Sequence, residues 1–172
     1  MALLDELGAP GHLKRHGELV TDVAVQLVDG LTSLGLELDR AFVQCGALLH
    51  DSGKIQVPAE LHSPGRLHEA AGEEMLLAIG VAPKLARVCR THAAWDDPSC
   101  ELEEQVIALA DKLWKGRRVD ELELLVIDRV AGRLGQGRFD IFQDLDGLFE
   151  GLAADGDRRL TASLGGGSES VP

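Results

Sequence analysis

The stretch AFVQCGALLHDSGK, residues 41–54, restricts the fold more than any other part of the sequence. Its apolar residues predict a helix from Arg40 to about Asp51 that is buried over most of its circumference, with Asp39 as the N-cap. That helix ends in adjacent His50 and Asp51. Two ionisable side chains at the end of a buried segment are costly without a partner, and a metal ion suits a neutral imidazole beside a carboxylate. The stretch therefore predicts a central helix that carries part of a metal site.

Apolar residues at steps of three and four predict helices along most of the remaining chain. These helices span about 12–34, 67–79, 83–92, 99–115, 120–134 and 139–154, with an ordered loop at 55–65. No convincing period-two strand is present, so the sequence predicts an all-α, single-domain helical bundle. Its parts are a domain over 1–154, with a motif-bearing core at about 11–115 and C-terminal helices at about 120–154, and a flexible tail over 155–172.

Charge and length exclude several classes of protein. A chain of 172 residues with 45% hydrophobic and 27% charged residues is typical of one globular domain with a substantial core. A formal net charge of −12 would repel nucleic acid and anionic membranes, so neither is an expected partner. A small phosphorylated ligand remains possible where a metal supplies local positive charge.

The cysteines and the N-terminus indicate a cytoplasmic protein. The three cysteines are odd in number and form no C-x-x-C pair, which favours small core-filling thiols in a reducing compartment. The acidic N-terminus lacks the basic region of a signal peptide, and no apolar run approaches the ~20 residues that span a bilayer.

Five positions place a potential metal ligand within otherwise apolar helical surface. They are His16, the pair His50 and Asp51, His68, His92 and Asp111. A single histidine on an apolar face is more often a packed core residue than a ligand. Core-facing histidines in four separate helices, together with the aspartates, point instead to one shared metal site.

The order of these residues resembles that of the HD superfamily of metal-dependent phosphohydrolases. His16 in HGELV matches the first histidine of that pattern, and Asp111 in IALADKL matches its distal aspartate. His50 and Asp51 in LLHDSGK match the His-Asp doublet. The resemblance spans roughly 11–114 and implies a helical bundle that hydrolyses a phosphate compound.

Two further histidines fall in the interval between the doublet and the distal aspartate. His68 lies in LHEAAG and His92 in CRTHAAW. This order is similar to that of the bacterial diadenosine tetraphosphate hydrolases of the superfamily, which implies a dinuclear centre. The paired histidine and Gly-Tyr-Pro signature of the cyclic-di-GMP phosphodiesterase branch are absent.

This set of residues suits hydrolysis of a phosphate ester or anhydride. Asp51 has two oxygens with which to bridge two cations, while the other ligands leave room for water. The cations would neutralise phosphoryl oxygens and activate a water molecule at neutral pH. Lys54 is the candidate for binding substrate phosphate and stabilising the transition state, and the alternative is an exposed loop lysine. Ligand type does not distinguish Fe, Mn, Ni, Co, Zn or Mg.

The expected function is therefore metal-dependent hydrolysis of a nucleotide or related small phosphate compound. One alternative is a di-iron oxygenase of the same superfamily, and another is a non-catalytic nucleotide-binding module. Phosphate-loop, Rossmann and G-x-S-x-G motifs are absent. For four further residues the sequence is compatible either with a role in the site or with an ordinary surface or packing role. They are His12, His62, Glu69 and Trp95.

Overall fold

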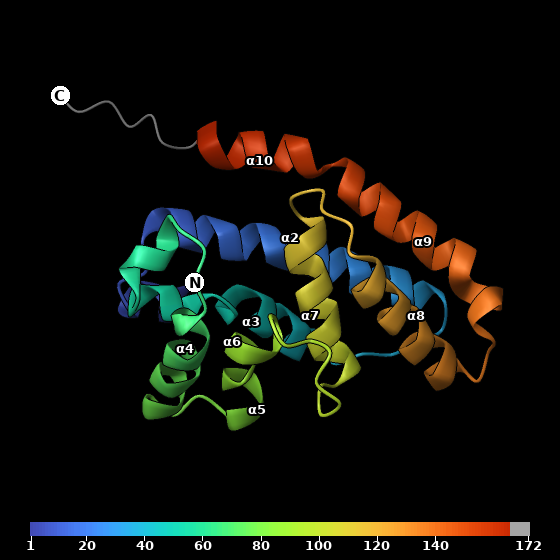
Figure 1. Ribbon diagram of the computed structural model, residues 1–172, viewed down its shortest axis with the longest axis horizontal. Coiled ribbons are helices and arrows are strands. Elements are labelled where there is room, and N and C mark those ends of the chain that lie inside the picture. Colours follow the sequence, from blue (N-terminus) through green and yellow to red (C-terminus); the bar gives the residue numbers. More distant parts are fainter. Residues whose placement is uncertain (166–172) are drawn as a thin grey trace.

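The computed structural model describes residues 1–165, and these form helices joined by short connections (Figure 1). The prediction of an all-α fold is confirmed, because no strand occurs within the described residues. The elements are α1 (Ala2–Glu6), α2 (Gly11–Ser33), α3 (Arg40–Leu49), η1 (Ser52–Ile55), η2 (Pro58–Leu61), α4 (Leu67–Ala78), α5 (Pro83–Ala86), α6 (Val88–Thr91), α7 (Leu102–Leu113), α8 (Asp120–Leu134), α9 (Arg138–Ala154) and α10 (Gly156–Gly165), of which η1 and η2 are 3-10 helices.

The main core lies where α2, α3 and α7 pack together. Every residue of α7 from Leu102 to Asp111 is buried, so this helix is enclosed by its neighbours on all sides. Close packing of α2 and α3 depends on Gly17, where a Cβ atom would lie 2.9 Å from the Leu48 carbonyl oxygen. The predicted N-cap of α3 is confirmed, since the Asp39 carboxylate accepts a hydrogen bond from the Phe42 backbone N–H at 2.9 Å.

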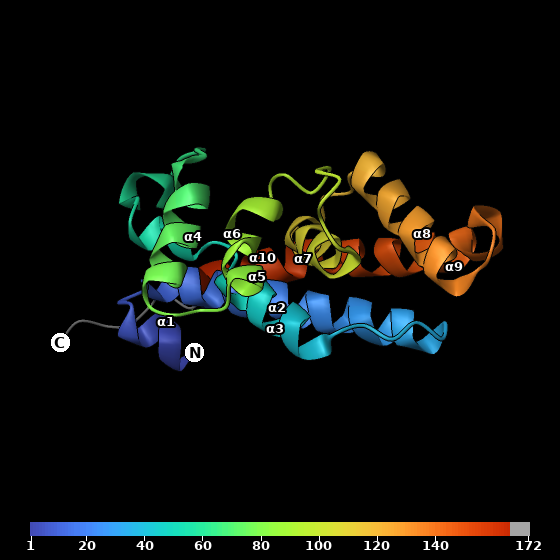
Figure 2. The same ribbon diagram turned by 90° about the horizontal axis from the view of Figure 1, so that it is seen from below.

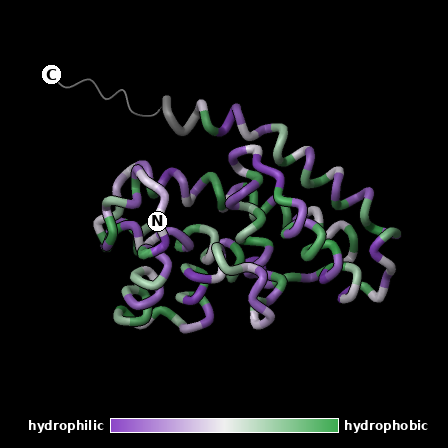
Figure 3. The backbone as a smooth tube through the Cα atoms, viewed as in Figure 1, coloured by the Kyte–Doolittle hydropathy of each residue, from purple (hydrophilic) through white to green (hydrophobic). Residues whose placement is uncertain are grey.

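A second, smaller hydrophobic cluster joins the N-terminal helices to α4–α6. Leu4, Leu13, Leu49, Leu76 and Cys89 are among its buried members. The two clusters share α2 and α3, which continue from one into the other. In Figure 3 the long helices alternate between hydrophobic and hydrophilic residues, as amphipathic helices do. None of the described helices is both long enough and apolar enough to span a lipid bilayer.

Cys45, in α3, is exposed, although the sequence predicted that all three cysteines fill the core. Val43, Ala47 and His50 face the core, whereas Cys45 is exposed, because α2 and α7 pack on the other side of the helix. Cys89 and Cys100 are buried as predicted.

Alkylation of the native protein is expected to label Cys45 alone among the cysteines. Burial raises the pKa of the Cys89 thiol to about 11, so at pH 8 it is neither ionised nor accessible. Peptide mass spectrometry after a short iodoacetamide treatment checks this. Equal labelling of Cys89 and Cys45 would contradict it, and labelling in denaturant, where all three react, is the control.

The C-terminal helices close the other side of the main core. Leu145 and Phe149 of α9 are completely buried, and Arg118 links α8 to α9 through Glu123 and Asp146. Both ribbon views place α8 and α9 at the end of the molecule farthest from α4 (Figures 1 and 2).

The structure differs from the predicted tail over Gly156–Gly165, which form α10 and lie against α2 and α9. Gly156 approaches Gly116 so closely that a Cβ atom would lie 2.2 Å from the Gly116 nitrogen. The Arg159 guanidinium is buried and donates a hydrogen bond to the Leu152 carbonyl oxygen at 2.7 Å. These are long-range contacts that a polar sequence pattern does not reveal. The rest of the predicted tail, 166–172, lies outside the described residues.

Candidate metal centre

His16, His50, Asp51 and Asp111 converge on one point, although they come from two helices, α2 and α7, and from the turn between α3 and η1. The Nε2 atoms of His16 and His50 are 3.1 Å apart. The Asp51 Oδ2 atom lies 3.2 Å from His16 Nε2 and 3.7 Å from His50 Nε2. The Asp111 Oδ1 atom lies 3.6 Å from each of the same two nitrogens. The structure thus brings together the residues predicted as the core of the site.

His68 and His92 approach the same aspartate from its other side. Their Nε2 atoms lie 3.2 Å and 3.6 Å from Asp51 Oδ1. Two groups of side chains are therefore close enough to hold a metal ion, with Asp51 in both. One group contains His16 and His50 and the other contains His68 and His92, so each carboxylate oxygen of Asp51 faces a different pair of imidazoles.

The ends of short helices position most of these side chains. His50 is the C-cap of α3 and Asp51 the N-cap of η1, so the doublet occupies the turn between the two helices. His68 lies in the first turn of α4 and His92 is the C-cap of α6. His16 projects from α2, and Asp111 from α7. The turn after the doublet packs tightly on α4 because Gly53 has no side chain.

Three of the histidines present the Nε2 lone pair to the centre, because their Nδ1 atoms face acceptors. His50 Nδ1 lies 2.7 Å from the Ala47 carbonyl oxygen, and His92 Nδ1 lies 3.2 Å from that of Val88. A carbonyl oxygen only accepts hydrogen bonds, so in both rings Nδ1 carries the proton. His68 Nδ1 similarly donates to a carboxylate, which leaves its Nε2 as a buried atom without a hydrogen-bond partner among the described residues.

The charges also fit a cation at this position. Burial opposes ionisation of Asp51, but its histidine neighbours lower the pKa of this carboxyl group well below its usual value. The pKa of Asp111 is likewise well below its usual value, because His50 outweighs the effect of burial. Burial lowers the pKa of His92 to about 4, so its imidazole is neutral at pH 7. Neutral imidazoles and ionised carboxylates are the form in which these side chains bind metals.

The HD domain family matches residues 14–114, which contain all six of the converging residues. The chain belongs to this family. The proteins of the HD domain superfamily are mostly metal-dependent hydrolases, and HD domains bind divalent metals. An uncharacterized protein of Methanocaldococcus jannaschii is 29% identical over 136 residues, which cover 70% of this chain and 76% of that protein. No solved structure matches the chain.

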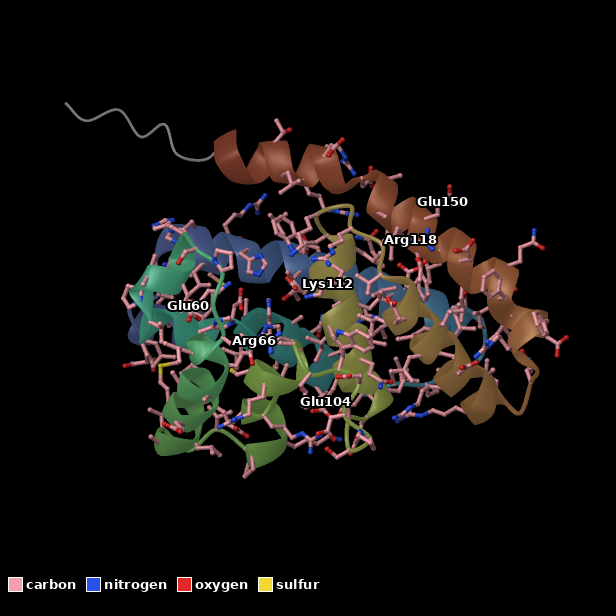
Figure 4. The ribbon with its side chains drawn as sticks, viewed as in Figure 1. Glu60, Arg66, Glu104, Lys112, Arg118 and Glu150 are labelled. Atoms are coloured by element: carbon pink, nitrogen blue, oxygen red, sulfur yellow. The ribbon has the colours of Figure 1, made fainter. Side chains whose placement is uncertain are left out.

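A carboxylate that the sequence pattern did not reveal holds one histidine of the HD domain in place. Glu60, at 8% exposure, accepts a hydrogen bond from His68 Nδ1 at 2.6 Å and from the His68 backbone N–H at 3.1 Å. Its other oxygen accepts from the Leu67 backbone N–H at 3.1 Å. A Cβ atom at Gly65 would lie 2.1 Å from Glu60, so the loop is shaped around this carboxylate (Figure 4). Glu69, the carboxylate considered from the sequence, lines the pocket but makes no hydrogen bond with His68 within the described chain.

Replacing Glu60 with Gln is expected to weaken metal binding at the His68 side of the HD domain by about 10- to 100-fold. The reason is that a carboxylate hydrogen-bonded to a ligating histidine fixes its orientation and raises its basicity. Metal titration by calorimetry checks this, with Glu69→Gln as the comparison. The prediction would be contradicted if the wild type and Glu60→Gln bound metal with equal affinity, or if only Glu69→Gln bound metal more weakly.

All of the converging side chains except His50, which is completely buried, line a pocket of about 400 Å³. Lys54, the predicted phosphate-binding residue, lines it and places its Nζ atom 2.5 Å from Asp51 Oδ2. A lysine that the sequence pattern did not single out, Lys115, also lines the pocket. The pocket of this HD domain thus contains positive charge beside the aspartates.

The remaining sequence candidates divide between the pocket and other surroundings. His12 lines the pocket, and its ring centroid lies 5.5 Å from that of His62, which is not a lining residue. Trp95 instead packs against the main core, and its carbonyl oxygen accepts a hydrogen bond from Gln105. The tryptophan that lines the pocket is Trp114, whose ring contacts His16 edge to face at 5.0 Å between centroids. Its position at the end of α7, beyond Asp111, gave no separate signal in the sequence.

Proposed function

We propose that this HD domain is a phosphohydrolase that uses two divalent metal ions to cleave a phosphoester or phosphoanhydride bond in a nucleotide or related small compound. The observation that carries this proposal is the position of Asp51 between two pairs of histidines, with one carboxylate oxygen toward each pair. A shared carboxylate is typical of two-metal sites that bind both oxygens of a displacement at phosphorus.

In this proposal His16, His50, Asp51 and Asp111 hold one ion, and His68, His92 and Asp51 hold the second. When bound, such ions supply Lewis acidity toward phosphoryl oxygens and activate water for attack. The carboxylates are ionised, and His50, His68 and His92 each direct Nε2 toward the centre. The neighbouring aspartates raise the pKa of the His50 and His68 imidazoles, so a metal ion would take the place of any proton on their Nε2 atoms.

Lys54 is the proposed residue for binding the phosphate that reacts. Its ammonium group lies against Asp51 and lines the pocket, so a phosphoryl oxygen that reaches Asp51 also reaches this donor. A fixed positive charge stabilises the negative charge that develops on the phosphoryl group and its leaving oxygen. The order of the histidines, similar to that of the diadenosine tetraphosphate hydrolases, and the apolar wall formed by Leu13, Leu61 and Trp114 support an organic phosphate as substrate.

Metal analysis combined with a hydrolysis screen tests the proposal. The purified protein is loaded separately with Mn, Fe, Co, Ni, Zn and Mg, and its bound metal is counted. Each preparation is then assayed for phosphate or nucleotide release from dinucleoside polyphosphates, mononucleotides and cyclic nucleotides. We expect two ions per chain and release from at least one substrate class. Full activity after removal of metal by a chelator would refute the proposal.

The same preparations distinguish the other two functions. An oxygenase of the same superfamily would consume dioxygen with the iron-loaded protein and release no phosphate from nucleotides. A nucleotide-binding module would bind nucleotides without turnover. The lysines beside Asp51 and Asp111 favour the hydrolase, because they add positive charge where a phosphate would lie.

A further inference from the structure

The cations around the pocket differ from most of those elsewhere on the chain. Most arginines and lysines pair with carboxylates away from the site, as Arg87 does with Glu104 and Arg133 with Glu103. Lys54, Lys112 and Lys115 are different. In the described part of the chain, their ion pairs are made only with Asp51 and Asp111, the two aspartates of the centre.

These lysines approach the pocket from two opposite elements. Lys54 belongs to η1, whereas Lys112 lies in the last turn of α7 and Lys115 in the turn that follows this helix. Lys112 lies 2.7 Å from Asp111 Oδ2 and does not line the pocket, so it neutralises that carboxylate from behind. Lys115 does line the pocket.

Lys115 retains its capacity to donate hydrogen bonds. Its Nζ atom is 3.9 Å from Asp111 Oδ2, beyond hydrogen-bonding distance, and its side chain is 35% exposed. It donates no side-chain hydrogen bond to any described residue. An ammonium group has three N–H donors, and here all three remain available to a ligand in the pocket.

Arg66 provides a second uncommitted cation on the opposite side. It is exposed, is the N-cap residue of α4 and follows Gly65; Gly65 lines the pocket and Arg66 lies next to it, outside the lining. Within the described residues it forms no ion pair and no side-chain hydrogen bond. In Figure 4 its side chain extends from the start of α4 toward the region between α4 and α7, where Lys112 also lies. A guanidinium group is suited to bidentate binding of phosphate.

We propose that Lys115 and Arg66 form a second anion subsite at the rim of the pocket, which holds a phosphate group that is not cleaved. This inference rests on the proposed function and specifies its substrate as a compound with at least two phosphate groups. The reacting phosphate lies at Lys54 and the aspartates, and the second lies toward the end of α7. A pocket of about 400 Å³ has room for more than one phosphate group, since it lies in the range that accommodates small organic ligands.

Binding of two non-hydrolysable probes tests the subsite independently of catalysis. Methylenediphosphonate has two phosphonate groups and methylphosphonate has one. Calorimetry with the metal-loaded protein is expected to show tighter binding of the first. Lys115→Gln and Arg66→Gln are each expected to weaken methylenediphosphonate binding about 10-fold and methylphosphonate binding less than about twofold, since each loses one charge-assisted hydrogen bond.

Arg117→Gln is the matched control. Arg117 is exposed, lies two residues beyond Lys115, does not line the pocket, and carries the same charge. Its replacement therefore reproduces the change in net charge without changing the subsite, and both affinities should be retained. Metal content is measured after each titration to verify that the probe has not removed the ions.

The outcomes separate this inference from the proposed function. Equal binding of both probes by the wild type, or unchanged methylenediphosphonate binding in Lys115→Gln and Arg66→Gln, overturns the subsite even where phosphate esters are hydrolysed. The subsite is also overturned if Arg117→Gln weakens methylenediphosphonate binding as much as the two subsite variants do, because the change in net charge then explains the effect. A third outcome is that Lys115→Gln and Arg66→Gln selectively weaken methylenediphosphonate binding while the wild type hydrolyses no nucleotide. This outcome supports the subsite and refutes the proposed reaction.

Discussion

Asp51→Asn is expected to remove both metal ions and to lower the rate of hydrolysis by at least about 1000-fold, equivalent to about 4 kcal/mol of activation free energy. Asp51 is the residue that both ligand groups share, with Oδ2 at 3.2 Å from His16 and Oδ1 at 3.2 Å from His68. Asparagine keeps the shape of the side chain but loses the charge and one of the two oxygen ligands. Elemental analysis of the purified variant and a single-turnover assay measure the two effects.

Asp111→Asn is the matched comparison. Asp111 Oδ1 lies 3.6 Å from the Nε2 atoms of both His16 and His50, whereas Asp111 forms no ion pair with His68 or His92 among the described residues. This variant should therefore lose one ion and keep the other. Two ions retained in Asp51→Asn, or the same metal content in both variants, would show that Asp51 is not shared. Thermal unfolding of each variant excludes a general loss of structure.

Gly53→Ala is expected to destabilise the fold by about 3 kcal/mol, at the upper end of the cost of overpacking. A Cβ atom at this position would lie 1.9 Å from the His68 carbonyl oxygen and 2.6 Å from the Gly72 nitrogen. Both are backbone atoms of α4, so the clash cannot be relieved by rotating a side chain. The turn that carries Asp51 must move away from α4, which carries His68.

The same variant should therefore lose activity by more than its stability alone explains. A displacement of about 1 Å between reacting groups lowers a rate by about 100-fold. Urea unfolding and steady-state kinetics measure the two effects at a temperature where the variant is folded. The control is Gly132→Ala in α8, where an added Cβ atom would have no neighbour within 4 Å and alanine favours the helix. Wild-type stability in Gly53→Ala would contradict the close packing of η1 on α4.

The helices were predictable because their signals are local. The helix Asp120–Leu134 was predicted with the bounds that the structure shows, since its apolar period is continuous and a glycine at 135 with a positive φ of 65° ends it. Asp39 was recognised as an N-cap for a similar reason. The four histidines were selected because each interrupts an apolar stripe, and buried stripes of one domain face a common core.

The structural features that the sequence did not predict depend on contacts between segments that are distant along the chain. Glu60 lies in the 3-10 helix η2, within a segment whose sequence has no helical period and predicted only a loop. Its contact with His68 exists only because the fold places η2 beside the start of α4. Lys115 was predicted only as the last residue of a helix, and its position in the pocket distinguishes it from other lysines. Helix α10 has a polar sequence, and its formation involves the close approach of Gly156 to Gly116 and the buried Arg159.

The sequence by itself determined the long amphipathic helices and which histidines and aspartates face inward, because both follow from the period of neighbouring residues. Only the tertiary structure decided that Asp51 presents one oxygen to His16 and the other to His68, and that Lys54 and Lys115 line the same pocket. These relations depend on distances between helices. The distances are set by backbone approaches such as that of Gly53 to α4, which no local pattern of residues encodes.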